Sequence, residues 1–138
     1  LYPNFITFRP GGGCSSPVGC QRGEQFVTLG FGCAVGNVIH EIGHAVGLWH
    51  EQSREDRDSH ITIVMEKVIP ALRHNFDQHI RDGIDTGDYN YGSIMHYPRT
   101  AFSIDGSETV IPKLEGAEIG QREALSDGDV QAVKEMYA

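Results

Sequence analysis

The 138-residue sequence lacks several features that would assign it to large classes of proteins. No apolar run approaches the roughly 20 residues that a helix needs to cross a bilayer, so we expect no membrane span. No basic segment followed by an apolar stretch marks a signal peptide, and we find no internal repeat or low-complexity segment. The first residue is Leu1 and not Met, so we expect a processed or excised chain.

Basic residues are also scarce. The chain has 11 Lys and Arg against 19 Asp and Glu, which gives a formal net charge of −8. Nucleic-acid binders depend on Lys and Arg to neutralise phosphates, so this balance argues against a nucleic-acid partner. Because the acidic residues are dispersed along the chain, a solvated surface is the simplest explanation for them.

Cysteines are few and odd in number: Cys14, Cys20 and Cys33. One disulfide and one remaining thiol is the simplest arrangement, and it suggests an oxidising compartment. The composition is otherwise ordinary, with 39% hydrophobic and 22% charged residues, so we expect a globular domain with an apolar core. The length fits one domain.

The pattern of apolar residues predicts strands first, one long helix next and a largely irregular second half. The segment Tyr2–Arg9, which contains Phe5–Phe8, and the segment Gln25–Leu29 are rich in aromatic and β-branched residues, as strands are. Apolar residues then recur at helical offsets of three and four from Val35 to Trp49. We also expect a short helix over 70–74, a loop over 82–92, and a last helix that begins at Ser126 with a capping box and packs an apolar stripe on the core.

The strongest motif lies on the predicted long helix: His40-Glu41-Ile42-Gly43-His44, followed by Gly47 and His50. Residues four apart on a helix are displaced by only about 40°, so both imidazoles can reach one ion. Gly47 can end the helix in a left-handed conformation and return His50 to the same ion. Three neutral histidines leave a coordination position open for water, as in catalytic zinc sites. Glu41 is then placed to act as general base toward that water.

Two other interpretations of this motif compete with a catalytic site. A bare H-E-x-x-H can occur by chance on any amphipathic helix, but the added glycine and third histidine make that explanation weak. A structural zinc site is the second alternative, and it is disfavoured because the motif contains no cysteine and gives Glu41 no structural role.

With Glu51 directly after the third histidine, the motif resembles that of the astacin family of metzincin metalloendopeptidases. Ser93-Ile94-Met95-His96-Tyr97 resembles the Met-turn of that family, and the segments 53–58 and 120–122 are also similar to astacin sequences. The resemblance extends from about Phe5 to Tyr137.

The resemblance implies further roles, residue by residue. Met95 would form an apolar floor beneath the zinc-bound imidazoles, and Tyr97 would be a switchable ligand that stabilises the oxyanion. Cys14 and Cys33 would form the loop-tying disulfide of the family. The second disulfide of the family has no matching cysteine near Ala138, so Cys20 would be a free thiol or link to another chain. Glu51 would be the glutamate near which the mature N-terminus of the family lies, a structural position. The cofactor would be one catalytic Zn²⁺ ion.

The expected fold is α+β: an astacin-like catalytic domain over residues 1–138 that lacks the N-terminal part of the family domain. We expect sheet strands and the active-site helix in 1–50, and an irregular C-terminal subdomain with the Met-turn and a last helix in 51–138. By resemblance, the strand at Gln25–Leu29 would be an edge strand that borders the substrate; the residues alone fit an ordinary core strand equally well. Arg99 and Arg122 are weaker candidates for a pocket that accepts acidic side chains.

The expected function is zinc-dependent hydrolysis of internal peptide bonds of proteins or peptides, outside the cell, with Glu41 as general base. The alternative is a latent or inactive zinc-bound form held by a propeptide or by a separate N-terminal fragment of the same precursor.

Overall fold

The computed structural model describes residues 2–138 of the chain, so the expectation that rests on Leu1 lies outside the described residues. The described residues form two compact units, 2–49 with 122–138 and 50–121. Among the described helices, none combines the length and the apolar character that a bilayer span requires. The fold is α+β, as predicted.

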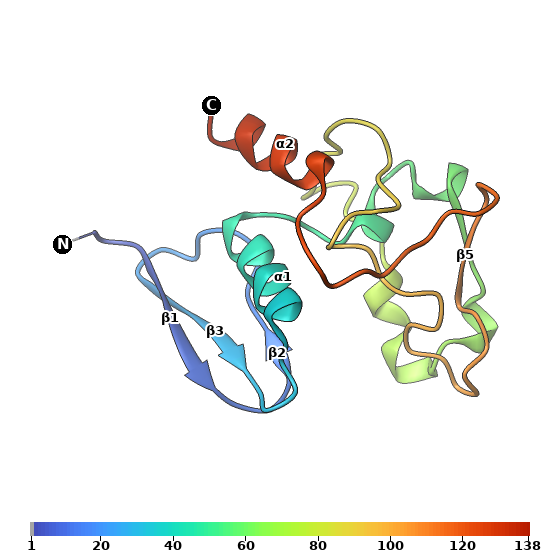
Figure 1. The fold of residues 1–138 in the computed structure, drawn as a ribbon, viewed down its shortest axis with the longest axis horizontal. Coiled ribbons are helices and arrows are strands. Elements are labelled where there is room, and N and C mark those ends of the chain that lie inside the picture. The colour runs from blue at the N-terminus through green and yellow to red at the C-terminus, as the bar shows by residue number, and fades with distance from the viewer. Residues whose placement is uncertain (1) are drawn as a thin grey trace. The chain divides into compact units, whose positions relative to one another are not determined.

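The first unit contains a three-stranded sheet beside the long helix (Figure 1). Strand order in the sheet is β1-β3-β2, with β1 parallel and β2 antiparallel to β3. The bounds are β1 Phe5–Pro10, β2 Cys14–Ser15, β3 Glu24–Leu29 and α1 Val35–Val46. Both strands predicted from the sequence are therefore present, while β2 was not predicted because two residues carry no periodicity.

The prediction of an edge strand at Gln25–Leu29 is wrong. β3 is the middle strand, since β1 pairs along its whole length and β2 pairs with its last two residues. The side chains of Gln25 and Val27 are buried at 6% and 0% exposure, which fits a central strand whose inner face is covered. A strand of alternating character looks the same in sequence whether one or both of its edges are paired.

The last helix, α2 (Asp127–Met136), also belongs to the first unit. Its capping box is confirmed: Asp129 N donates to Ser126 Oγ, and Ser126 N donates to an Asp129 carboxylate oxygen. Its apolar stripe is not buried as predicted, because Val130 remains 36% exposed and Tyr137 67%. Instead, the Tyr137 hydroxyl donates to Val46 O at the end of α1.

A second close approach explains why residues 122–138 group with the first unit and not with the expected C-terminal segment 51–138. A Cβ on Gly36, in the first turn of α1, would lie 1.6 Å from Arg122 O. Only glycine permits this contact, so the start of α1 is fitted against the main chain that leads into α2.

The second unit has little regular structure, as predicted for the second half of the chain. Two short strands, β4 Ile61–Ile63 and β5 Val110–Pro112, pair antiparallel. Short 3₁₀ helices accompany them: η1 Glu51–Ser53, η2 Arg57–Ser59, η3 Met65–Lys67 and η4 Pro70–Phe76. The core of this unit is a cluster of buried side chains, namely Ile61, Val68, Phe76, Tyr89, Tyr97 and Val110.

Candidate metal centre

α1 presents two histidines of the motif from one face. His40 and His44 are one turn apart, each only 6% exposed, and their ring centroids lie 4.7 Å apart with the ring planes perpendicular. Rings this close, on a rigid helix, require no further ordering of the chain in order to bind one ion.

Gly47 ends α1 in the predicted left-handed conformation, with φ 116° and ψ 4°. Its N–H donates to His44 O, and the N–H of Leu48 donates to Gly43 O, so two carbonyls of the last helical turn are satisfied. This conformation is uncommon for residues with a Cβ, which is why the motif has glycine here. The chain direction therefore changes three residues before His50.

The structure brings the three imidazoles together. His40, His44 and His50 each offer a ring nitrogen, and these atoms all lie within 4.8 Å of one another. Within residues 2–138, this is the one group of three or more His, Cys, Asp or Glu side chains so arranged. Neutral imidazoles that converge in this way suit zinc and other divalent transition metals.

The main chain sets the tautomer of His44. Its Nδ1 lies 2.8 Å from Leu48 O, and since a carbonyl only accepts, Nδ1 carries the proton. Nε2 then has the lone pair that a metal ligand needs. Burial lowers the pKa of His44, with Arg122 lowering it further and the Leu48 carbonyl opposing, so the neutral ring is favoured.

Glu41 follows His40 in the sequence and is buried, at 6% exposure. Burial raises the pKa of its carboxyl, while the positive charge of Arg122 lowers it. A carboxylate in such an environment is a stronger base than one in water. Its assignment as general base remains a prediction.

The segment predicted to be the Met-turn does form a turn. His96 N donates to Ser93 O, which closes a four-residue turn, and Met95 N donates to Ser93 Oγ. Met95 is only 1% exposed, and its carbonyl accepts a hydrogen bond from Glu51 N. Its position relative to the imidazoles as a floor stays a prediction.

Tyr97 is 8% exposed and packs against the third histidine. The ring centroids of Tyr97 and His50 lie 4.4 Å apart at a tilt of 53°. Phe76 and Phe102 meet the Tyr97 ring edge to face, at 5.7 and 5.4 Å. The aromatic ring is thus held by packing on several sides.

Glu51 links the turn after His50 to the segment before the Met-turn. One of its carboxylate oxygens accepts from Asn90 N at 2.7 Å and lies 3.5 Å from an Arg54 nitrogen. Glu51 thus contacts two segments of the second unit, while its predicted place near a mature N-terminus stays a prediction.

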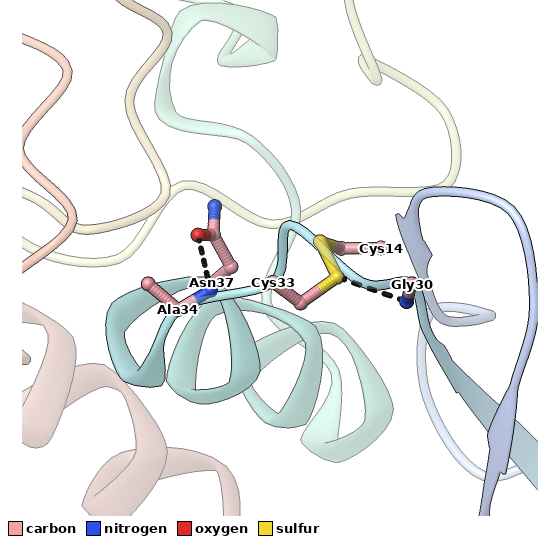
Figure 2. The surroundings of a disulfide bond; sticks show 5 residues. All are labelled: Cys14, Gly30, Cys33, Ala34 and Asn37. Carbon is pink, nitrogen blue, oxygen red and sulfur yellow. Dashed lines mark hydrogen bonds between the residues drawn. A yellow bond between two sulfur atoms is a disulfide. The ribbon is translucent and has the colours of Figure 1, made fainter.

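The disulfide between Cys14 and Cys33 is confirmed. Figure 2 shows it next to the start of α1, where Gly30 N donates to Cys33 Sγ and Ala34 N donates to the side chain of Asn37. The bond therefore ties β2 to the loop that enters the helix. Cys20 is an exposed thiol.

Sequence reasoning missed several residues that support the site. Gln52 is fully buried and its Oε1 accepts from Tyr97 N at 3.0 Å. His96 Nδ1 donates to Tyr97 O, and Tyr89 Oη lies 2.8 Å from His96 Nε2. No local pattern could reveal the first contact, because its partners are 45 residues apart. Arg99, proposed for a pocket, pairs with the exposed carboxylate of Glu108.

These observations define the class of the chain: an α+β domain whose long helix and glycine turn bring together three histidines that could hold a metal ion. Comparison with known proteins identifies the family. The sequence model of the astacin family, a family of peptidases, matches residues 2–138, and the chain belongs to this family.

Individual relatives agree with this. The chain is 44% identical to the zinc metalloproteinase nas-15 of Caenorhabditis elegans, over 97% of this chain and 24% of that protein. It is 44% identical to the low choriolytic enzyme of Oryzias latipes, over 96% of this chain and 50% of that protein. The chain therefore spans between about a quarter and a half of the length of these curated relatives.

A solved structure shares the fold. High choriolytic enzyme 1 of medaka, a hatching enzyme zinc-protease, superposes with a TM-score of 0.91 at 38% identity, over 99% of this chain and 70% of that chain. The predicted astacin-like fold is thus confirmed.

Proposed function

We propose that this chain is the catalytic part of a zinc-dependent endopeptidase that hydrolyses internal peptide bonds. The observation that supports this most directly is the convergence of His40, His44 and His50 beside the buried carboxyl of Glu41. Membership of a peptidase family and the names of the relatives agree with it.

The three histidines are proposed to hold a single zinc ion through their ring nitrogens. The donor chemistry fits, since three neutral nitrogens and no thiolate leave room for substrate and water, as in catalytic zinc sites. The hydrogen bond from His44 Nδ1 to Leu48 O favours the neutral ring with a lone pair on Nε2. When bound, zinc would supply the Lewis acidity that polarises a peptide carbonyl and acidifies a water molecule.

Two side chains are proposed to move or share the charges of the reaction. Glu41 takes a proton from the attacking water and later gives it to the leaving amine, which its raised pKa favours. Tyr97 donates its phenolic hydrogen to the oxyanion of the tetrahedral intermediate, because a phenol keeps its proton at neutral pH. Contact with the His50 ring supports a place for Tyr97 near the metal.

The proposed substrates are proteins or peptides, and the proposed location is outside the cell. The relatives include choriolytic enzymes, one of which is described as a hatching enzyme zinc-protease. The Cys14–Cys33 disulfide supports an oxidising compartment, where such bonds persist.

The variant Glu41→Gln tests this function. It keeps the shape of the side chain but cannot accept a proton, so we expect cleavage of casein to fall by roughly 10²- to 10⁴-fold while bound zinc is retained. Glu55→Gln, at an exposed position of the second unit, is the control and should leave both quantities unchanged. A Glu41→Gln protein that cleaves casein as fast as its parent would rule out Glu41 as the general base.

A second candidate is a latent form in which another segment of the same precursor covers the chain. Exposed aromatic side chains on the sheet favour a further polypeptide partner: Phe5 and Phe8 on β1 are each 51% exposed, and Phe26 on β3 is 36% exposed. Among the described residues, β1 pairs with β3 alone, so its other edge offers backbone groups to a partner strand or loop.

Native mass spectrometry of the protein from its source distinguishes these forms. A propeptide or N-terminal fragment that stays bound to this chain, and whose removal raises casein cleavage, is the result that the latent form requires. A folded, active monomer that consists of this chain alone would exclude it.

A further inference from the structure

We propose that Gln52 is a positioning residue that holds Tyr97 against the His50 ring. This inference rests on the proposed function, in which Tyr97 stabilises the oxyanion. Gln52 itself is proposed to touch neither metal nor substrate.

Gln52 joins two segments that are distant in sequence. It lies in η1, two residues after His50, and its Oε1 accepts from Tyr97 N at 3.0 Å. One residue earlier, Glu51 N donates to Met95 O at 3.2 Å. Two hydrogen bonds therefore connect the turn that carries the third histidine to the turn that carries Tyr97.

The side chain is itself held in place. Gln52 is 0% exposed, and its main-chain carbonyl accepts from Arg57 Nη1 at 3.1 Å. The same guanidinium nitrogen donates to the main-chain oxygen of Phe76, the last residue of η4. The ring of Phe76 packs against Tyr97. An amide fixed at its main chain and buried in a medium of low dielectric makes a directional and strong hydrogen bond.

Gln52 binds the main-chain amide of Tyr97, and the side chain of His96 binds its main-chain carbonyl. His96 Nδ1 lies 2.8 Å from Tyr97 O, so the amide and carbonyl of the same residue both have buried partners. With its main chain fixed at both ends, the phenol can keep its tilt and its distance of 4.4 Å to the His50 ring. Oxyanion stabilisation depends on such preorganised geometry, since small displacements of a donor reduce the rate strongly.

The variant Gln52→Met isolates this contact. Methionine matches glutamine in length and flexibility but offers Tyr97 N no amide oxygen. Gln52 Nε2 has no hydrogen-bond partner among residues 2–138, so the change removes only one side-chain hydrogen bond. Gln52→Glu is the rescue variant, because a carboxyl oxygen can accept in either protonation state.

Gln78→Met is the matched control in the same unit. Gln78 Nε2 donates to Arg54 O and Glu55 O, at 3.0 and 2.9 Å, far along the chain from the Tyr97 segment. The variant therefore removes side-chain to main-chain hydrogen bonds without removing the bond to Tyr97 N.

The first measurement does not depend on activity. We expect hydrogen exchange of the Tyr97 amide in the zinc-loaded protein to become roughly tenfold faster in Gln52→Met, and to return toward the parent rate in Gln52→Glu. Gln78→Met should leave it unchanged. Equal exchange rates in the parent and Gln52→Met would overturn the proposal.

The second measurement is a double-mutant cycle with Tyr97→Phe on a peptide substrate. We expect Gln52→Met to lower kcat roughly tenfold with KM and zinc content nearly unchanged, and to have little further effect in the Tyr97→Phe background. Reductions in kcat that multiply in the double variant would show that Gln52 acts independently of Tyr97, and would overturn the proposal. If Glu41→Gln remains fully active, the proposed function fails instead, while amide exchange still decides whether Gln52 holds Tyr97.

Discussion

The His50 imidazole reaches the other two because one residue has an unusual main-chain conformation. Gly47 has φ 116°, and its N–H donates to His44 O while the chain turns away from the helix axis. At this residue the backbone geometry, and not a side chain, positions a proposed ligand.

Replacing Gly47 with Ala should therefore affect stability and metal binding together. An L-residue in this left-handed region costs about 1–2 kcal/mol, and the added Cβ would lie 3.4 Å from Met136 Sδ. We expect urea denaturation to show a free energy of unfolding lower by that amount, and chelator competition to show weaker zinc binding. Gly12→Ala is the control, since a Cβ there meets nothing within 4 Å. Equal losses in both variants would contradict the assigned role of Gly47.

Single residues were the scale at which sequence reasoning succeeded most. The histidine spacing and the glycine turn are local, and their geometry follows from one helix and its end. The contact between Gln52 and Tyr97 could not be predicted in this way, because glutamine has no pattern that indicates a partner 45 residues distant.

At the scale of elements, the entry to α1 is fixed by a covalent bond. Cys33 lies two residues before the helix and is joined to Cys14 in β2, 19 residues earlier. Since β2 pairs with the end of β3, the disulfide connects the sheet to the helix that carries the first two histidines.

Removal of this disulfide should destabilise the chain. In the chain-entropy account, a disulfide that closes a loop of this length stabilises the fold by about 3 kcal/mol. We therefore expect urea denaturation of the Cys14→Ser, Cys33→Ser double variant to show a free energy of unfolding lower by about 3 kcal/mol. Cys20→Ser is the control: its thiol is exposed, and we expect no change. A double variant as stable as the parent would show that the sheet and helix pack without the bond.

Elements also show where prediction from periodicity ends. The strands at Phe5–Pro10 and Glu24–Leu29 and the helix at Val35–Val46 have clear apolar patterns. β4 and β5 have three residues each and β2 has two, too few to show alternation. The central position of β3 depends on which strands pair with it, and pairing partners are not encoded by the strand alone.

For the whole molecule, metal binding should be coupled to stability. A ligand that binds the folded chain adds about 4 kcal/mol when its free concentration is roughly 1,000 times the dissociation constant. We expect zinc to raise the melting temperature, and chelation to lower it again, with activity lost in parallel. In His50→Ala the response to zinc should be much smaller. A melting temperature that does not change with zinc would contradict the proposed centre.

The sequence by itself determined the histidine motif, the left-handed glycine and the capped last helix, because each depends on residues within a few positions of one another. It also determined the family, because several such short motifs follow one another along the chain. Tertiary structure decided the order of strands in the sheet and the grouping of residues 122–138 with the first unit. It also decided the burial of Gln52 against the main chain of Tyr97. Hydrogen bonds and close packing between distant segments form only once the chain has folded, so no local pattern records them.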